Sequence, residues 1–446
     1  MVASALAASL SRRQIHYSWV ALAVTFLTML VMAGAMGAPG VLIAPLRREF
    51  GWNTEQISSA LAIRFALYGL IGPFAAAFMN YFGVRRVMLA ALALVASGLS
   101  VSLFMTQFWQ LVLLWGLVVG VGTGLTAMVL GATVATRWFS RRRGLAVGLL
   151  SASSATGQLV FMPLMASLTE HHGWRMALTF ICIAIGVVAV VVLALMRNHP
   201  ADVQLPLYGA DEVVSAPGPV RDLRQLFFTP LRVLKEAAQT WTFWVLFMTF
   251  FICGASTNGL VQTHFVSLCG DYNIAATTAA GVLALMGIFD FFGTVGSGWL
   301  SDRFDNRWLL FWYYGLRGIS LVLLPFSHFT VLGLSGFALL YGLDWIATVP
   351  PTVKLTAQRF GPDKANVVFG WVFAGHQLGA AFAAYGAGWT RTHFASYLPA
   401  FFIAGCLCVI GALMALSIVP ARPVGPNLRG NAGASGSRAR TALQRS

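Results

Sequence analysis

The chain has 446 residues, of which 58% are hydrophobic and 10% charged, and its mean hydropathy is +0.76. An average soluble protein is about a quarter charged and less than half apolar, so this composition excludes a soluble enzyme, a disordered chain and a coiled coil. Lys and Arg number 29 against 14 Asp and Glu, a formal charge of +15 that would suggest a nucleic-acid partner only in a soluble chain.

Apolar runs long enough to cross a membrane follow one another along the chain. Backbone amides in hydrocarbon need hydrogen-bond partners within their own segment, so such runs are expected to be helices. The sequence therefore predicts an all-α polytopic membrane protein with twelve transmembrane helices, arranged as two pseudo-symmetric bundles of six. The runs cover about residues 19–46, 57–79, 87–105, 108–136, 144–167, 176–196, 241–268, 278–300, 308–327, 329–357, 366–389 and 397–419.

Polar segments divide the chain into predicted domains. The linker contains an amphipathic stretch, Leu223 to Ala238, that is suited to lie along the membrane interface. The five cysteines show no spacing typical of a metal site or a disulfide framework, so we expect packing residues, with no metal and no cofactor. The domains are an N-terminal segment (1–18), two six-helix bundles (19–196 and 241–419), the linker (197–240) and a basic, disordered tail (420–446).

The positions of the cations predict the orientation. With twelve spans, both termini lie on the same side, and 22 of the 29 Lys and Arg residues lie on that side against four on the other. Positively charged loops remain in the cytoplasm. We therefore expect both termini in the cytoplasm and the spans in the inner (plasma) membrane, with lipids rather than nucleic acid as partners.

The two halves repeat each other at an offset of 222 residues. Identical residues then coincide at corresponding span ends and loops. Two parallel six-helix repeats are typical of transporters that rock around a central site between the halves. The coincident pairs include Trp19 and Trp241, Arg85 and Arg307, Gly120 and Gly342, Thr126 and Thr348, and Gly157 and Gly379.

Loop motifs carry a family resemblance. Residues 298–307, GWLSDRFDNR, resemble the G-x-x-x-D-R-x-G-x-R loop of the major facilitator superfamily, with Asp305 where glycine is usual. The first-half copy has Asn80 and Tyr81 in the acidic and first basic positions. Residues 45–58 and 138–148 are similar to the monocarboxylate porter branch, which includes oxalate/formate exchanger-like and lactate transporter-like proteins. The resemblance implies a monomeric secondary transporter that moves a small organic anion by alternating access, with protons, as a symporter or exchanger.

Charged residues in the loops at the cytoplasmic ends of the spans are candidates for a gate, independently of the family resemblance. Ion pairs from these loops to neighbouring helix ends can form in one conformational state only and so bias a two-state equilibrium. The basic cluster at Arg141 has an alternative role, in which it enforces topology and contacts anionic headgroups. The predicted gating residues are Asp302, Arg303, Arg307, Arg85 and Arg141.

Three ionisable residues lie near the middle of consecutive spans. Asp290, Arg317 and Asp344 fall at one depth in the eighth, ninth and tenth runs, where charges are costly and are functional candidates. They form either a closed structural triad or a proton-coupling site. The resemblance places the ninth span outside the central cavity, which favours Arg317 as a structural partner and Asp290 or Asp344 as the titrating acid.

A further set of polar residues is predicted to bind substrate. Arg64, within the second span, either reaches outward to water or anchors an anion. Asn258 and Gln262 lie four residues apart on the seventh span and share a helix face. Gln158 on the fifth span and His376 on the eleventh lie near mid-depth, although a lone membrane histidine is more often a packing residue.

The sequence departs from the branch that it resembles. Monocarboxylate porters of this kind typically carry an Arg four residues after the Asp of the eighth span, and some carry a Lys on the first span. Position 294 is Thr, and residues 20–46 contain no Lys or Arg. Either Arg64 replaces the missing cation, or the substrate is not a simple monocarboxylate.

The sequence fits two other classes of function less well. A proton-driven efflux antiporter for amphipathic or drug-like compounds usually carries G-x-x-x-G-P-x-x-G-G on its fifth span, whereas only Gly157 lies between Gly148 and Pro163. A membrane receptor or enzyme is disfavoured because no metal cluster, nucleophile elbow or phosphate loop is present. We therefore expect a transporter and not an enzyme.

Overall fold

The computed structural model describes residues 2–210 and 223–418, and these residues are almost entirely helical. Among them, eleven helical stretches are long and apolar enough to cross a membrane. The 30-residue helix α9 (Arg143–His172) occupies the position of the fifth predicted span and completes the set of twelve. The predicted fold class is therefore confirmed.

The first half contains six spans, and single glycines join two pairs of them. Gly83 and Gly173 have φ angles of +85° and +83°, which glycine adopts without strain, so the chain reverses over one residue. A capping box of Asn53 and Gln56 begins the second span. The helices are α1 (Val2–Ser11), α2 (Ser18–Gly37), α3 (Pro39–Phe50), α4 (Thr54–Phe82), α5 (Val84–Ser102), α6 (Phe108–Leu111), the π-helix η1 (Val112–Val119), α7 (Gly120–Leu125), α8 (Met128–Trp138), α9, α10 (Trp174–Leu195) and the 3₁₀ helix η2 (Pro200–Val203).

The second half repeats this order after the linker helix. The helices are α11 (Leu223–Ala237), α12 (Trp241–Gly254), the π-helix η3 (Ala255–Gln262), α13 (Thr263–Asp271), α14 (Ala276–Ser301), α15 (Asn306–Leu323), the 3₁₀ helix η4 (Leu324–Ser327), α16 (Val331–Asp344), α17 (Val349–Phe360), α18 (Pro362–Phe394) and α19 (Leu398–Leu416). Part of the predicted linker, 211–222, and the predicted tail, 420–446, lie outside the described residues. The domain boundaries stay predictions.

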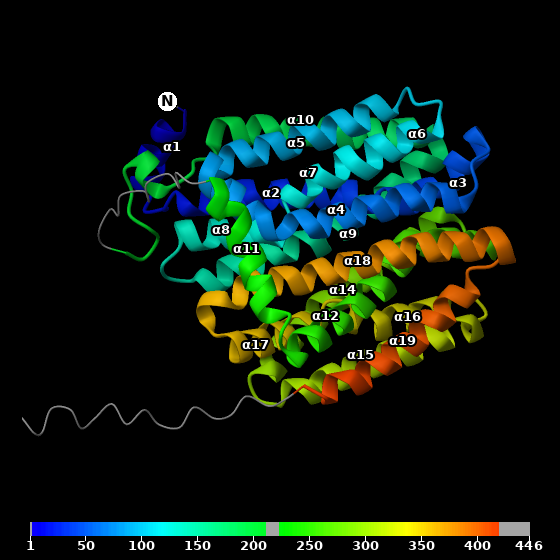
Figure 1. The fold of residues 1–446 in the computed structure, drawn as a ribbon. Coiled ribbons are helices and arrows are strands. Elements are labelled where there is room, and N and C mark those ends of the chain that lie inside the picture. The colour runs from blue at the N-terminus through cyan, green and yellow to red at the C-terminus, as the bar shows by residue number, and fades with distance from the viewer. Residues whose placement is uncertain (1, 211–222, 419–446) are drawn as a thin grey trace, which may run out of the picture.

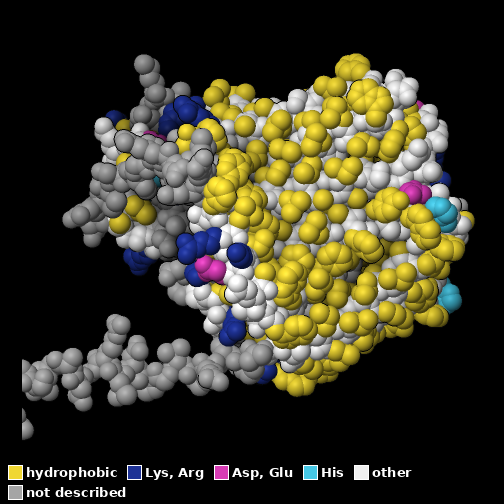
Figure 2. All heavy atoms as spheres, viewed as in Figure 1, with side chains coloured by type: hydrophobic (Ala, Val, Ile, Leu, Met, Phe, Trp, Pro, Cys, Tyr) yellow, Lys and Arg dark blue, Asp and Glu magenta, His cyan; other side chains and the backbone are white. Residues whose placement is uncertain are grey.

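The two halves lie side by side and meet along a seam (Figure 1). At the seam, α4 packs against α18, α9 against α14, and α3 against α13. The N-terminus and the end of α19 lie at one end of the molecule, which we call the terminal end, and the opposite end is the far end. Hydrophobic side chains cover the middle of the face shown in Figure 2, and charged side chains gather toward both ends.

Four spans are interrupted, although the sequence analysis predicted continuous runs. The first span breaks at Ala38, and the fourth breaks at Thr126 and Ala127. The tenth breaks at 345–348, and the seventh contains the π-helix η3. Prolines explain two breaks, because Pro39 begins α3 and Pro350 and Pro351 occupy the first turn of α17, where they cannot continue a preceding helix.

Candidate functional site

Four Arg, Lys, Asp or Glu side chains are buried among the described residues, and all four lie within spans. They are Arg64, Asp290, Arg317 and Asp344, each no more than 4% exposed. Burying a charge in an apolar medium is costly unless the charge is paired and hydrogen-bonded. The partners of each group therefore indicate its role.

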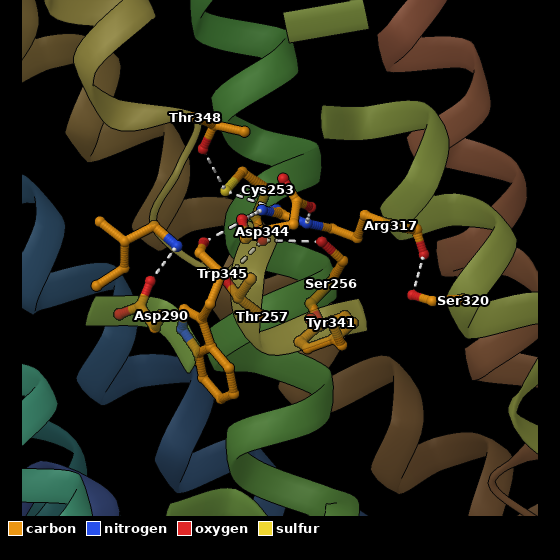
Figure 3. A network of polar contacts seen from close by, with 11 residues as sticks. Cys253, Ser256, Thr257, Asp290, Arg317, Ser320, Tyr341, Asp344, Trp345 and Thr348 are labelled. Carbon is orange, nitrogen blue, oxygen red and sulfur yellow. Dashed lines mark hydrogen bonds and ion pairs between the residues drawn. The ribbon is translucent and has the colours of Figure 1, made fainter. Parts of the chain in front are cut away.

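Arg317 is fully paired at the break in the tenth span (Figure 3). Its Nε lies 2.7 Å from Asp344 Oδ2, and its Nη2 donates to the carbonyl oxygens of Asp344 (2.5 Å) and Trp345 (3.1 Å). Its Nη1 donates to Cys253 Sγ at 2.9 Å. The guanidinium neutralises Asp344 and satisfies carbonyls that the end of α16 leaves without helical partners.

Asp290 approaches the same break from α14. Its Oδ1 accepts hydrogen bonds from the backbone N–H of Ile346 (2.9 Å) and the hydroxyl of Thr294 (3.0 Å). Two turns along α14, the Ser297 hydroxyl donates to the carbonyl of Ala347 at 2.5 Å. Among the described ion pairs, Arg317 bonds Asp344 and not Asp290. The three charged side chains therefore lie at the break in the tenth span, and among the described ion pairs only Arg317 and Asp344 pair with each other.

The equivalent break in the first half contains no charge. At the repeat offset of 222 residues, Tyr68, Val95 and Gly122 correspond to Asp290, Arg317 and Asp344. A Cβ atom on Gly122 would lie 2.7 Å from Val95 Cγ2, so these two positions are also neighbours. The charged cluster is thus present in the second half and absent at the equivalent positions of the first.

Arg64 is the buried cation of the first half. Its Nη2 donates to the carbonyl of Met36 at 3.0 Å, and its guanidinium lies 5.1 Å from the ring centre of Phe65. Its Nε is buried without a hydrogen-bond partner, and no carboxylate pairs with it among the described residues. The alternative in which Arg64 reaches outward to water is wrong, because the residue is only 2% exposed.

The predicted neutral residues lie on helices of the seam. The ring of His376 stacks on the ring of Phe373, with 5.6 Å between the ring centres. The Phe373 ring also packs edge to face on Tyr68 of α4 across the seam, with 6.0 Å between the ring centres. Gln262 is buried, and a Cβ atom on Gly40 of α3 would lie 2.6 Å from its carbonyl oxygen. Asn258 is half-buried in η3, which packs against α18. The side chain of Gln158 lies outside the described part.

The predicted gating residues contact their own half of the molecule or, for Arg141, the linker in this structure. The guanidinium carbon Cζ of Arg303 lies 4.0 Å from the centre of the Trp299 ring. Hydrogen bonds to the Arg307 side chain hold the pKa of Asp305 below its ordinary value. The other contacts join Asp302 to Lys354 (3.0 Å), Arg307 to Asp305 (2.6 Å), the Arg85 side chain to the carbonyl of Leu193, and the Arg141 N–H to the carbonyl of Tyr208 (3.0 Å).

Polar contacts across the seam gather at the far end. The Tyr385 hydroxyl donates to Glu55 Oε1 at 2.7 Å, and the Glu55 N–H donates to Thr392 at 3.2 Å. The Thr277 N–H donates to Glu170 Oε1 at 3.2 Å. The described hydrogen bonds between the two halves are therefore concentrated at the far end.

Two residues that contact the break in the tenth span or its charges carry no clear signal in the sequence. Cys253 was expected to be a packing residue, yet it accepts a hydrogen bond from Arg317 and lies 3.5 Å from the Thr348 hydroxyl. Ser297 was not singled out. The repeat did contain one signal, because Thr126 and Thr348 are identical and both lie at a break.

Sequence comparison identifies the family. The profile described as Major Facilitator Superfamily matches residues 24–384 and, in a second match, 270–444. The chain belongs to the Major Facilitator Superfamily. It is therefore a membrane transporter, and its relatives are transporters rather than enzymes.

Curated relatives within the Major Facilitator Superfamily are similar over nearly the whole chain. The "Uncharacterized MFS-type transporter YcxA" of Bacillus subtilis (strain 168) is 24% identical over 409 residues, which cover 90% of this chain and 95% of the relative. Monocarboxylate transporter 13 of Bos taurus is 27% identical over 402 residues, with coverages of 89% and 88%. The resemblance to monocarboxylate transporters is thus confirmed at modest identity.

A solved structure shows the same fold. The crystal structure of a D-xylose-proton symporter aligns with a TM-score of 0.68 over 91% of this chain and 98% of that one, at 16% identity. At such low identity, the likeness shows the architecture alone and carries no information about the substrate. The arrangement of the halves is therefore that of a superfamily transporter, and the substrate has to be argued from the buried charges.

Proposed function

We propose that the protein moves a small organic anion, a carboxylate, across the inner membrane by alternating access, coupled to protons by symport or exchange. The observation that carries this proposal is Arg64, a buried guanidinium near the seam with no carboxylate partner among the described residues. The proposal includes both termini in the cytoplasm, because the cations gather at the terminal end. It also includes a monomeric transporter.

An anionic ligand supplies what Arg64 lacks. Removing one partner of a buried ion pair typically costs about 3–5 kcal/mol, because the remaining charge stays uncompensated. Arg64 resembles such a remaining charge, because the described contacts of its guanidinium are one carbonyl and one aromatic ring. A carboxylate that entered the seam would gain a charge-assisted, bidentate contact, for which arginine is the preferred residue.

This arrangement also accounts for the cation that is missing from the eighth span. Thr294, at the position where related porters carry Arg, donates its hydroxyl to Asp290 and brings no charge. Asp290 is therefore not neutralised from its own helix. Arg64 places the anion-binding cation in the other half, on α4.

Asp290 is the group best placed to take up the proton. Asp344 is already paired with Arg317, whereas Asp290 is bonded only by a backbone N–H and a hydroxyl in the described contacts. The two unpaired buried charges are thus Arg64 and Asp290, of opposite sign and in opposite halves. Binding of one anion neutralises Arg64, and uptake of one proton neutralises Asp290. A site without net charge can be closed off from water on both sides at a lower cost in free energy than a charged site.

The test is binding to the purified chain and to its Arg64→Gln and Arg64→Lys variants. We would measure thermal shifts with a panel of monocarboxylates and their uncharged amides. Carboxylates should stabilise the wild type, the Gln variant should lose at least roughly tenfold in affinity, which corresponds to about 1.4 kcal/mol, and the Lys variant should lose less. Equal carboxylate affinity in wild type and Arg64→Gln would overturn the proposal. Stabilisation only by neutral or cationic compounds would favour an efflux antiporter.

A further inference from the structure

The linker helix α11 crosses the seam at the terminal end. In Figure 1 it runs crosswise to the spans. Toward the first half, the Phe227 ring lies 6.0 Å from Phe74 and 5.8 Å from Phe78, both on α4. Toward the second half, Trp371 of α18 donates its indole N–H to the carbonyl of Pro230 at 2.9 Å. One short helix therefore contacts both halves.

An ion pair adds a second link to α18. Glu236 lies 2.5 Å from Lys364 of α18 and 3.3 Å from Arg232, one turn back on α11. Beside α11, Phe74 and Trp371 meet edge to face at 5.8 Å across the seam itself. The inner face of α11 therefore packs against both halves.

The outer face of α11 combines apolar and cationic side chains. Phe228 is 63% exposed and Leu231 is 44% exposed. Arg232 has 84% of its side chain exposed, and Lys235 is exposed and forms no ion pair among the described residues. Aromatic and aliphatic side chains beside Lys and Arg on one helix face are typical of helices that lie in a membrane interface.

We propose that this outer face binds the headgroups of anionic phospholipids in the leaflet at the terminal end. Phe228 and Leu231 enter the boundary of the acyl chains, while Arg232 and Lys235 meet the lipid phosphates. The position supports this occupant, because α11 lies where the hydrophobic band of Figure 2 gives way to Lys and Arg side chains. A soluble anion would leave the two apolar side chains in water.

Lipid binding has a consequence for alternating access. The terminal end opens only when the α4 and α18 sides separate, and α11 contacts both of them. A headgroup-bound α11 is held in the plane of the membrane and across the seam. Anionic lipid therefore sets the stability of the closed terminal end.

The test is hydrogen exchange of α11 in the full chain, in nanodiscs of phosphatidylcholine alone or with about a third phosphatidylglycerol. In the wild type, the amides of residues 227–237 should exchange several-fold more slowly with phosphatidylglycerol present. Lys235→Gln should lose most of this protection, and a Phe228→Ser variant should lose it in part. Arg86→Gln is the matched control, because Arg86 is an exposed cation of the first half outside α11.

The outcomes are separable from those of the proposed function, because no substrate is added. Equal exchange rates in the two lipid mixtures would overturn the lipid proposal, as would an equal loss of protection in Arg86→Gln and Lys235→Gln. Protection that persists in Lys235→Gln but disappears in Glu236→Gln would assign α11 to the ion pair with Lys364 and also contradict the proposal.

Discussion

The two buried arginines of the spans differ in their hydrogen-bond partners. Arg317 has four described hydrogen-bond contacts and an aspartate partner, whereas Arg64 has one carbonyl and no carboxylate. A residue that stabilises the fold and a residue that awaits a ligand can therefore be distinguished by the same substitution. Both side chains are arginines at comparable burial, which makes the comparison a matched one.

Arg317→Gln should destabilise the protein strongly, because it leaves Asp344 and two backbone carbonyls buried without their donor. We expect a loss of about 3–5 kcal/mol. Arg64→Gln should cost no more than about 1 kcal/mol, the contribution of one ordinary hydrogen bond. The apparent Tm of the two variants in the same detergent checks this. A larger drop for Arg64→Gln would reverse the assignment of the two residues.

Asp290→Asn should separate coupling from binding. The amide still accepts hydrogen bonds from Ile346 and Thr294 through its oxygen, but it cannot take up a proton. We expect accumulation driven by a pH gradient to fall at least roughly tenfold in proteoliposomes, the change that the loss of about 1.4 kcal/mol of coupling would give, while exchange of substrate for substrate continues. Accumulation at the wild-type rate would exclude Asp290 as the coupling residue.

At the scale of the secondary-structure elements, the spans could be predicted from the sequence, whereas the breaks within the spans could not. The apolar runs were sufficient to predict every span and most of the bounds, because hydrocarbon permits only helices of about that length. The breaks at 126–127 and 345–348 lie inside apolar runs, so hydropathy does not indicate them, although Pro350 and Pro351 follow the second break directly. Asp290, Ser297 and Arg317 reach the second break from α14 and α15, and their convergence is a property of packing.

The candidate site was predictable only in part. Arg64, Asp290, Arg317 and Asp344 could be named from the sequence because a charge within an apolar run is conspicuous. Which of them pair could not be deduced, since the Arg317 contacts run to two other spans. The sequence also gave no reason to select Cys253, an apolar-seeming residue among Phe and Ile neighbours.

The far-end contacts predict a gate. Glu55→Gln combined with Glu170→Gln replaces the charged oxygens that accept from Tyr385 and Thr277 across the seam by neutral amide oxygens, which accept weaker hydrogen bonds. We expect the population open at the far end to rise by roughly fivefold, which corresponds to about 1 kcal/mol. Faster hydrogen exchange in the first turn of α4 and the last turn of α18 measures this.

Glu49→Gln is the control for the gate, because it removes a carboxylate at the same end without crossing the seam. Glu49 contacts Arg175 at 2.6 Å and Trp174 at 2.6 Å, both in the first half. Equal acceleration in Glu49→Gln and in the double variant would show that loss of any far-end carboxylate loosens this region.

At the scale of the whole molecule, the charge distribution predicts which end faces the cytoplasm. Ser140 is exposed beside the basic loop at the terminal end, and Thr106 is exposed in the loop after α5. In intact cells that carry a Cys406→Ser background, an impermeant maleimide should label Thr106→Cys. Ser140→Cys should react only after permeabilisation, by at least roughly a tenfold margin, because positively charged loops stay inside. Labelling of Ser140→Cys in intact cells would contradict the orientation.

The uncharged break in the first half means that the two repeats carry different buried charges. One repeat unit carries the cation proposed for substrate, and the other carries every acidic group buried within the spans among the described residues. A chain assembled from two copies of the first unit would keep the interrupted helices and two copies of Arg64, but it would have Tyr68 where Asp290 now accepts a hydrogen bond. If Asp290 takes up the coupled proton as proposed, such a chain would have no buried acid in that role, and we expect it to mediate only downhill diffusion of its substrate.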